Sequence, residues 1–355
     1  MAARCLQQAG FIARHVLLAC LACGLLACAG QGEKTAISKP AWPPPPAPAR
    51  VVFEQSFSTP EELGIEKGFW EWVGDFVFGS DNNRLVRPMA VVTTEDHHIF
   101  VADPGVRGIH RFDASGNTYQ LIRGENGLDL PSPVAMATDR KGNVYITDSK
   151  LARVFVIPRG GRFAVPLALD TELEQPTGIA IEPGTGDIYL VDTARHQVLS
   201  FDSNGTLLAR LGRQGVRPGE FNYPTLIWQQ NGTLYVTDAL NFRIQLFDLA
   251  GNYISSFGRA GQASGYQARP KGIATDSDGN IYVVDSLLNN IQLFDADGQY
   301  LLTIGELGQR PGQFWLPAGI YISPQQKIYV ADSHNHRVQV FRYLADSGSS
   351  AGGGL

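Results

Sequence analysis

Residues 327–342 read KIYVADSHNHRVQVFR: an aromatic-centred apolar run ends at Asp332, and a polar turn leads into a second alternating run. Similar stretches begin at five earlier positions: HIFVADPGVRGIHRFD at 98, NVYITDSKLARVFVIP at 143, DIYLVDTARHQVLSFD at 187, TLYVTDALNFRIQLFD at 233 and NIYVVDSLLNNIQLFD at 280. The spacings between the equivalent aspartates are 45, 44, 46, 47 and 47 residues, for Asp103, Asp148, Asp192, Asp238, Asp285 and Asp332. A nearly constant period of this length indicates a repeat architecture.

Each repeat has the pattern of a small antiparallel sheet. A proline and a short apolar segment come first, as in LPAGIYI (316–322), and a last short run such as YLLTIG (300–305) ends the unit. Four runs rich in Val, Ile, Tyr and Phe, joined by Gly, Asn and Asp turns, predict four antiparallel strands. One such sheet cannot bury both of its faces, but six sheets packed around an axis can. The sequence therefore predicts an all-β, six-bladed β-propeller of four-stranded antiparallel blades over residues 51–343.

The last repeat lacks a fourth strand, because only a Gly/Ser-rich tail (344–355) follows it. The N-terminal stretch EWVGDFVFG (71–79) ends like the last strands SSFG (255–258) and LTIG (302–305). We therefore expect residues 71–79 to supply the missing outer strand, with VVFEQSF (51–57) as a further strand beside it. The ring is thus expected to be closed by a strand from the N-terminal part of the chain.

The repeat unit resembles the NHL repeat. The shared pattern is a proline, Gly-Ile-Ala, a turn, Ile-Tyr-Val-x-Asp, a polar turn and Arg-Ile-Gln-Val-Phe, and it extends over about residues 71–343. The resemblance is strongest in the fourth, fifth and sixth units. It implies a six-bladed propeller, in agreement with the count of repeats. It does not imply one function, because this fold hosts binding modules, sensor domains and a few enzymes.

The N-terminus has the pattern of an export signal. Arg4 and Arg14 precede the apolar run HVLLACLACGLLA (15–27), which has signal-peptide length and is too short to span a membrane. The run continues into Cys28, and Leu25-Leu26-Ala27-Cys28 resembles the bacterial lipobox. That resemblance implies that residues 1–27 are removed, that Cys28 carries palmitate-type acyl chains, and that these chains insert into a lipid membrane. An ordinary secretory signal is the alternative.

The residue after Cys28 bears on the destination. Ala29 stands where the inner-membrane retention signal of such lipoproteins has Asp. The resemblance therefore points to an outer-membrane lipid anchor, with the body periplasmic or on the cell surface. Residues 28–50 contain the run AWPPPPAPAR and are expected to form a proline-rich tether.

Cysteine use and charge exclude two classes of function. All four cysteines, Cys5, Cys20, Cys23 and Cys28, lie at or before the expected cleavage point, so the body has no thiol for a disulfide or for catalysis. Removing residues 1–27 takes away two arginines and no acidic residue. The remaining 27 basic and 34 acidic residues give a net charge of -7, which argues against nucleic acid as a partner.

The polar residues of the repeats are expected to be structural. His334 and His336 lie in a turn where the other units have residues of every kind, and a metal site would need further ligands from neighbouring blades. The repeated aspartates are expected to accept hydrogen bonds from this turn and to pair with Arg153, Arg243 or Arg337. DSDGN (276–280) and DADGQ (295–299) resemble calcium loops and are expected to be tight turns, with a weak calcium contact as the alternative.

Related propellers also include a zinc lyase that cleaves peptidyl-hydroxyglycine, in which three blades place His directly after the first-strand proline. The six equivalent positions here carry no histidine, being Met89, Val134, Thr177, Thr225, Lys271 and Ala318. No catalytic residue, metal site or cofactor is predicted.

Differences between the blades point to one face of the ring. The turn after the second strand and the loop after the fourth strand share a face, and there we predict partner-binding residues at Tyr223, Leu240, Phe242, Leu287, Leu288 and Trp315. The alternative is that these loops pack their side chains against one another. Arg87, Arg269 and Lys271 are expected at the channel rim on that face, either receiving a carboxylate or an acidic loop, or simply solvated.

The sequence thus predicts a monomeric, non-catalytic, membrane-tethered scaffold that binds an envelope protein. The alternatives are a lyase or hydrolase with its site in the central funnel, and a sensor module for a small periplasmic ligand.

Overall fold

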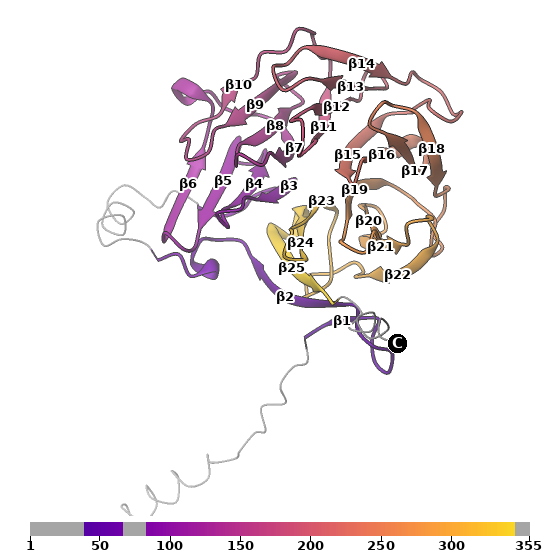
Figure 1. The fold of residues 1–355 in the computed structure, drawn as a ribbon. Helices are drawn as coiled ribbons and strands as arrows, with labels where there is room; N and C mark the ends of the chain where they lie inside the picture. The colour runs from indigo at the N-terminus through magenta and orange to yellow at the C-terminus, as the bar shows by residue number, and fades with distance from the viewer. Residues whose placement is uncertain (1–38, 67–82, 345–355) are drawn as a thin grey trace, which may run out of the picture. The chain divides into compact units, whose positions relative to one another are not determined.

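The computed structural model describes residues 39–66 and 83–344. Its strands form six antiparallel sheets that follow one another around a central axis (Figure 1). The six-bladed, four-stranded propeller predicted from the repeats is confirmed. The expected signal peptide, Cys28, the stretch 71–79 and residues 345–355 of the tail lie outside the described residues.

The blades run in sequence order, each with its first strand innermost. Blades one to three consist of β3 (Ala90–Thr93), β4 (Ile99–Asp103), β5 (Gly108–Asp113), β6 (Thr118–Ile122), β7 (Pro133–Thr138), β8 (Val144–Asp148), β9 (Arg153–Ile157), β10 (Val165–Pro166), β11 (Pro176–Ile181), β12 (Ile188–Asp192), β13 (Gln197–Phe201) and β14 (Leu207–Leu211). Blades four and five consist of β15 (Pro224–Gln230), β16 (Thr233–Asp238), β17 (Arg243–Asp248), β18 (Tyr253–Phe257), β19 (Pro270–Thr275), β20 (Ile281–Asp285), β21 (Asn290–Phe294) and β22 (Tyr300–Ile304). Blade six contains β23 (Pro317–Ile322), β24 (Lys327–Asp332) and β25 (Arg337–Tyr343), and is completed from the N-terminus.

Apolar residues of the repeat form the core between the blades. Equivalent positions in the third strands are at most 1% exposed, and they are Phe112, Ile157, Phe201, Phe247, Phe294 and Phe341. Burying a side chain of this size contributes roughly 1.5–3 kcal/mol. Every blade repeats this contribution, so the same packing stabilises all six blades of the ring.

The turns between strands depend on aspartate and glycine. Asp276 accepts hydrogen bonds from the backbone N–H groups of Asp278 and Asn280, and Gly279 has a φ of 84°. Asp295 makes the same contacts in the next hairpin of blade five. A glycine takes this left-handed conformation without steric cost. The prediction that DSDGN and DADGQ form tight turns is confirmed.

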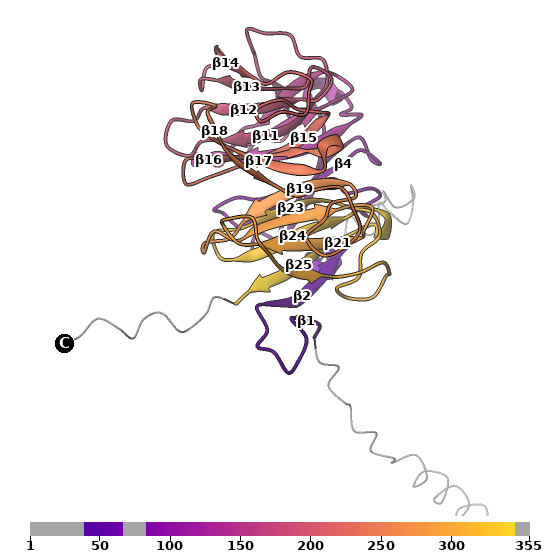
Figure 2. The same ribbon diagram turned by 90° about the vertical axis from the view of Figure 1, so that its right-hand side faces the viewer.

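An N-terminal strand closes the ring, as predicted, but it is not the stretch we expected. β2 (Val51–Phe57) pairs antiparallel with β25, with Val51 opposite Tyr343 and Phe57 opposite Val338. The prediction that residues 71–79 take this place is wrong, because β2 occupies it. Figure 2 shows β2 and β25 side by side.

A register shift explains how β2 fits between two neighbouring blades. The pairing with β25 shifts between Phe53 and Gln55. Val51 and Phe53 then pack in the core shared with blade five, and Phe57 packs with Phe112 of blade one. An extra residue in one strand turns the following side chains to the other face of the sheet. β2 therefore fills the core on both sides of blade six.

Part of the expected tether packs on the propeller. β1 (Ala41–Trp42) pairs with β2 as a fifth strand of blade six, and the Trp42 ring lies 5.7 Å from the Phe341 ring in an edge-to-face arrangement. Residues 41 and 42 of the expected tether are therefore part of blade six, and the Trp42 ring packs against its core, partly buried. Within the described ranges, no helix is both long and apolar enough to cross a membrane.

Candidate functional site

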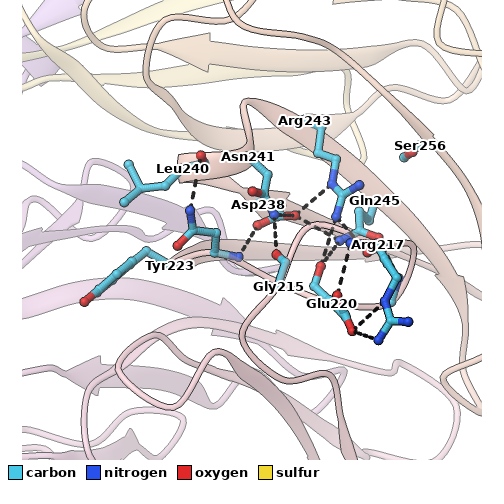
Figure 3. A network of polar contacts seen from close by, with 12 residues as sticks. Gly215, Arg217, Glu220, Tyr223, Asp238, Leu240, Asn241, Arg243, Gln245 and Ser256 are labelled. Carbon is cyan, nitrogen blue, oxygen red and sulfur yellow. Dashed lines mark hydrogen bonds and ion pairs between the residues drawn. The ribbon is translucent and has the colours of Figure 1, made fainter.

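The repeated aspartates organise one end of each blade. In blade four, Asp238 accepts hydrogen bonds from the side chains of Asn241, Arg243 and Gln245 at 2.8–3.0 Å, and from the backbone N–H of Asn222 (Figure 3). A buried carboxylate requires such a set of donors. The aspartate thereby ties the turn after the second strand to the loop that enters the blade.

Blade six repeats this network residue for residue. Asp332 accepts from Asn335, Arg337 and Gln339, and from the backbone N–H of Trp315. Burial raises the pKa of Asp332, and these hydrogen bonds oppose that effect. The predicted pairs with Arg243 and Arg337 are confirmed, whereas among the described residues Asp148 and Arg153 form no ion pair. Asp148 takes backbone N–H donors instead.

The two histidines of the opening stretch belong to this turn. The φ of His336 is 54°, and the equivalent residue is left-handed in every blade, namely Arg107, Ala152, His196, Phe242 and Asn289. The His336 ring contacts the carbonyl of Val86, and the His334 ring lies 5.6 Å from the Trp315 ring. The position therefore has a backbone role that does not depend on residue type. Within residues 39–66 and 83–344, no three His, Cys, Asp or Glu side chains are grouped as a metal site.

Blade five lacks the side-chain network. Leu288 and Asn290 stand where blade four has Asn241 and Arg243. Within residues 39–66 and 83–344, Asp285 therefore accepts only from backbone N–H groups, including those of Leu287 and Leu288. Leu287 is 55% exposed as a result of its place in this turn. Blade five thus presents an apolar side chain at the edge of the ring face.

The predicted rim residues meet at one mouth of the central channel. A cavity of about 300 Å³, here called the cationic cavity, is lined by Arg87, Arg269 and Lys271, with Met89 and His334 among its other walls. The Lys271 ammonium lies 3.9 Å from the Met89 sulfur. Desolvation, and then the charges of Arg269 and Arg87, lower the pKa of Lys271 to about 8. Among the described residues that line this cavity, none carries a carboxylate.

Four of the six predicted partner-binding residues are exposed on the same face. Tyr223, Leu240 and Trp315 are 45%, 50% and 42% exposed, and Leu287 joins them. Phe242 and Leu288 are half-buried. These four exposed residues and the cationic cavity together are called the mouth face.

Local contacts hold three of the four exposed residues of the mouth face. Trp315 contacts His334, which lines the cationic cavity, and the Tyr223 ring lies 4.6 Å from the His196 ring. The backbone N–H of Leu240 donates to the carbonyl of Asn222, the residue before Tyr223. Trp315 therefore lies beside the cationic cavity, and Leu240 lies beside the loop that carries Tyr223.

The opposite end of the channel holds a cavity whose lining residues were not predicted from the sequence. A cavity of about 530 Å³, here called the base cavity, lies where the six inner strands end, and residues of all six blades line it. Its largest side chains are Trp228 of β15 and Tyr321 of β23. When the repeats are aligned, the positions equivalent to Trp228 and Tyr321 carry small or aliphatic residues in the other four blades. This difference is the only indication of the cavity in the sequence.

Hydrogen bonds fix both rings of the base cavity. Trp228 Nε1 donates to Thr275 Oγ1 at 2.9 Å, and the Tyr321 hydroxyl donates to the carbonyl of Thr93 at 3.3 Å. Desolvation raises the pKa of Tyr321, so this hydroxyl stays protonated at neutral pH. The two ring centroids are 6.0 Å apart at an interplanar angle of 73°. The rings therefore form a fixed aromatic corner in the wall.

Three stretches of the chain match known families of β-propeller repeats. Residues 314–341 match the NHL repeat, residues 166–258 match a family described as a 6-bladed beta-propeller, and residues 253–284 match a beta-propeller repeat. The chain is a six-bladed β-propeller, and its sixth blade matches the NHL repeat. The resemblance inferred from the repeat pattern is thus confirmed.

Similar proteins differ in what their names describe. Peptidyl-glycine alpha-amidating monooxygenase A of Xenopus laevis is 27% identical over 167 residues, which cover 42% of this chain and 17% of that protein. The matched part of this chain spans less than a fifth of the length of the curated relatives that it matches. Virginiamycin B lyase of Staphylococcus aureus has a TM-score of 0.55 at 17% identity, covering 74% of this chain and 97% of the lyase.

A protein named for binding has the same fold. An auxiliary nutrient binding protein of Bacteroides thetaiotaomicron has a TM-score of 0.59 at 13% identity, covering 73% of this chain and 69% of that protein. These likenesses show the fold alone, which serves both lyases and binding proteins.

Proposed function

We propose that this NHL propeller is a non-catalytic scaffold that binds a protein of the cell envelope through the mouth face, and that acylated Cys28 holds it at the outer membrane. The observation that carries the proposal is the gathering of four exposed apolar side chains and three basic residues around one channel mouth. Blades four, five and six supply the apolar side chains, and blades one and five supply the basic ones.

The apolar residues have the chemistry of interface anchors. Tyr, Trp and Arg are enriched among the residues that carry most of the binding energy of protein interfaces. Tyr223 and Trp315 are each held by a contact with a neighbouring histidine ring, so they lose little side-chain freedom on binding. Leu240 and Leu287 expose about half of their surface to water, and covering them is favourable.

The cationic cavity has the chemistry to receive an acidic group of the partner. Lys271 lies between two other positive charges with no carboxylate in the cavity wall. A carboxylate placed there gains charge-assisted hydrogen bonds and relieves repulsion among the three basic residues. We therefore infer a partner that presents an Asp, a Glu or a C-terminal carboxylate inside an apolar rim.

Photo-crosslinking in intact cells of the native host tests the proposal. The photoreactive residue p-benzoylphenylalanine replaces Leu240 or Leu287, and it replaces the exposed Gln325 at the opposite end of the channel as the matched control. We expect one envelope protein to be crosslinked from both leucine positions and not from Gln325.

Two variants sharpen the crosslinking test. Leu287→Asp, combined with the crosslinker at position 240, is expected to abolish the adduct, and Lys271→Glu is expected to reduce it through charge reversal. An adduct that forms equally well from Gln325, or that survives both substitutions, would place the interface elsewhere and contradict the proposal.

A further inference from the structure

The base cavity is built by the ends of all six inner strands and is independent of the mouth face. Its wall includes Met136, Ile179, Ile273 and Ile320 together with the Trp228 ring. The first four are 2–8% exposed. A volume of about 530 Å³ lies within the range of roughly 300–1,000 Å³ typical of small-molecule pockets.

Polar atoms of the aromatic corner are already paired within the protein. Trp228 Nε1 donates to Thr275, the Thr275 hydroxyl donates to Gln230 Oε1 at 2.6 Å, and the Gln230 amide donates to the carbonyl of Asp276 at 2.9 Å. The Tyr321 hydroxyl is engaged by Thr93. Beside Met136, Ile179, Ile273 and Ile320, water finds few hydrogen-bond partners, whereas polar residues such as Gln229 and Asn231 line another part of the wall. An apolar occupant, by contrast, gains contact with the aliphatic and aromatic walls.

The charges near the opening of the base cavity do not select for an ion. Arg140 and Glu182 both line it and carry opposite charges. Asp276 is buried, and its carboxylate accepts hydrogen bonds from the side chains of Asn280 and Tyr282. The opening therefore differs from the cationic cavity, where three basic residues meet without a carboxylate in the wall.

We propose that the base cavity binds one uncharged, apolar molecule that carries an aromatic or fused ring, seated in the corner between Trp228 and Tyr321. Their fixed edge-to-face arrangement leaves ring surface for an edge or offset contact with a third ring. The mixed polar groups at the opening, such as Arg140 and Gln326, suit a single polar end on the ligand. The inference adds a small-molecule site at the end of the channel opposite the mouth face.

The test is a fluorescence titration of the purified full chain with N-phenyl-1-naphthylamine, an uncharged aromatic probe whose emission rises in apolar surroundings. We expect saturable binding with one site per chain. Trp228→Ala removes half of the corner, and Ala137→Trp places an indole in the cavity wall. Each substitution is expected to raise the Kd of the probe at least about tenfold, which corresponds to roughly 1.4 kcal/mol.

Matched controls separate the base cavity from the other apolar surface. Trp315→Ala removes an exposed indole on the mouth face, and Leu287→Asp removes an exposed leucine there; both are expected to leave the Kd unchanged. Circular dichroism melting of every variant checks the fold, and Ala137→Trp keeps the test valid if Trp228→Ala unfolds. Absence of saturable binding would overturn the inference. So would probe binding that Leu287→Asp abolishes and Ala137→Trp leaves intact.

Discussion

Replacing Lys271 by Met is expected to stabilise the propeller at neutral pH and to lose this effect at high pH. The environment of Lys271 lowers its pKa from 10.5 to about 8, first through desolvation and then through repulsion by Arg269 and Arg87. A difference of this size corresponds to about 3 kcal/mol at about 1.36 kcal/mol for each pH unit. Met keeps a similar length and can pack beside Met89 without a charge.

The sign of the pH dependence follows from proton binding. Below pH 8 the folded protein carries the partly buried Lys271 ammonium, so the full cost of its desolvation and of repulsion by Arg269 and Arg87 is present in the wild type and absent in Lys271→Met. Between about pH 8 and 10.5 the unfolded chain binds the proton more strongly than the folded one, so the wild type gains stability relative to the variant. The advantage of the variant should therefore fall from about 3 kcal/mol toward zero over this window.

Urea denaturation of both proteins at several values between pH 7 and 10.5 measures this difference. Subtracting the two curves at each pH removes the titration of all other groups, and the exposed Lys141→Met variant controls for the loss of one lysine. A Lys271→Met variant that is less stable than the wild type at pH 7, or whose advantage does not change with pH, would refute the reasoning. It would mean that Lys271 has a partner or sufficient water in the folded state.

Three further predictions concern the seam, the turn network and the anchor. Phe57→Ala should lower the free energy of unfolding by about 3–5 kcal/mol in urea denaturation, because the Phe57 ring is only 1% exposed and packs against Phe112. Phe163 is exposed, so the control Phe163→Ala should change this free energy little. Equal effects of the two substitutions would contradict a buried seam, meaning the pairing of β2 with β25. Asp332→Ala should cost about 3–5 kcal/mol in the same assay, because it leaves the Arg337 guanidinium without its buried carboxylate, and a neutral result would show that the network is dispensable. Cys28→Ser should move the protein from the membrane fraction to the soluble fraction of cells, and retention in the membrane would contradict lipid anchoring.

Most of the fold could be predicted from the repeat unit, because equivalent residues must pack in the same way in every blade. Asp238 and Asp332 show this directly: both sit in the same place in the repeat and collect the same set of side-chain donors. The turn chemistry of DSDGN and DADGQ was predictable for the same reason. The gathering of Arg87, Arg269 and Lys271 also followed from the repeat, because each of them is next to the proline at the start of an inner strand.

The closing strand was mispredicted because residues 71–79 resemble the outer strands of other blades more than β2 does. Residues 71–79 share their ending with the outer strands of other blades, whereas β2 resembles none of them. β2 is selected by packing on both sides of blade six, with Val51 and Phe53 facing one core and Phe57 facing another. The two groups of side chains face different cores because the pairing register shifts within β2, and no residue pattern in this stretch predicts that shift.

The base cavity escaped prediction because no single repeat contains it. Trp228 and Tyr321 come from blades four and six, and each is an ordinary aromatic residue within its own strand. Only the closed ring brings the two rings within 6.0 Å of each other. Sites assembled from one residue per blade are therefore poorly visible in the sequence, even where the blades themselves are evident.

A disulfide across the seam tests the central claim, a ring closed by β2, most directly. Val52 and Arg342 are opposite each other in the β2–β25 pair, and directly opposed antiparallel residues lie roughly 4.5–5.5 Å apart, within the range for a disulfide. The pair Val52→Cys and Arg342→Cys is made with Cys5, Cys20, Cys23 and Cys28 replaced by Ser. The account predicts that the bond forms in mild oxidant and stabilises the protein by about 5 kcal/mol, as a crosslink closing a loop of this length would. Two thiols that stay reduced in the folded protein, or a bond that destabilises it, would contradict the ring.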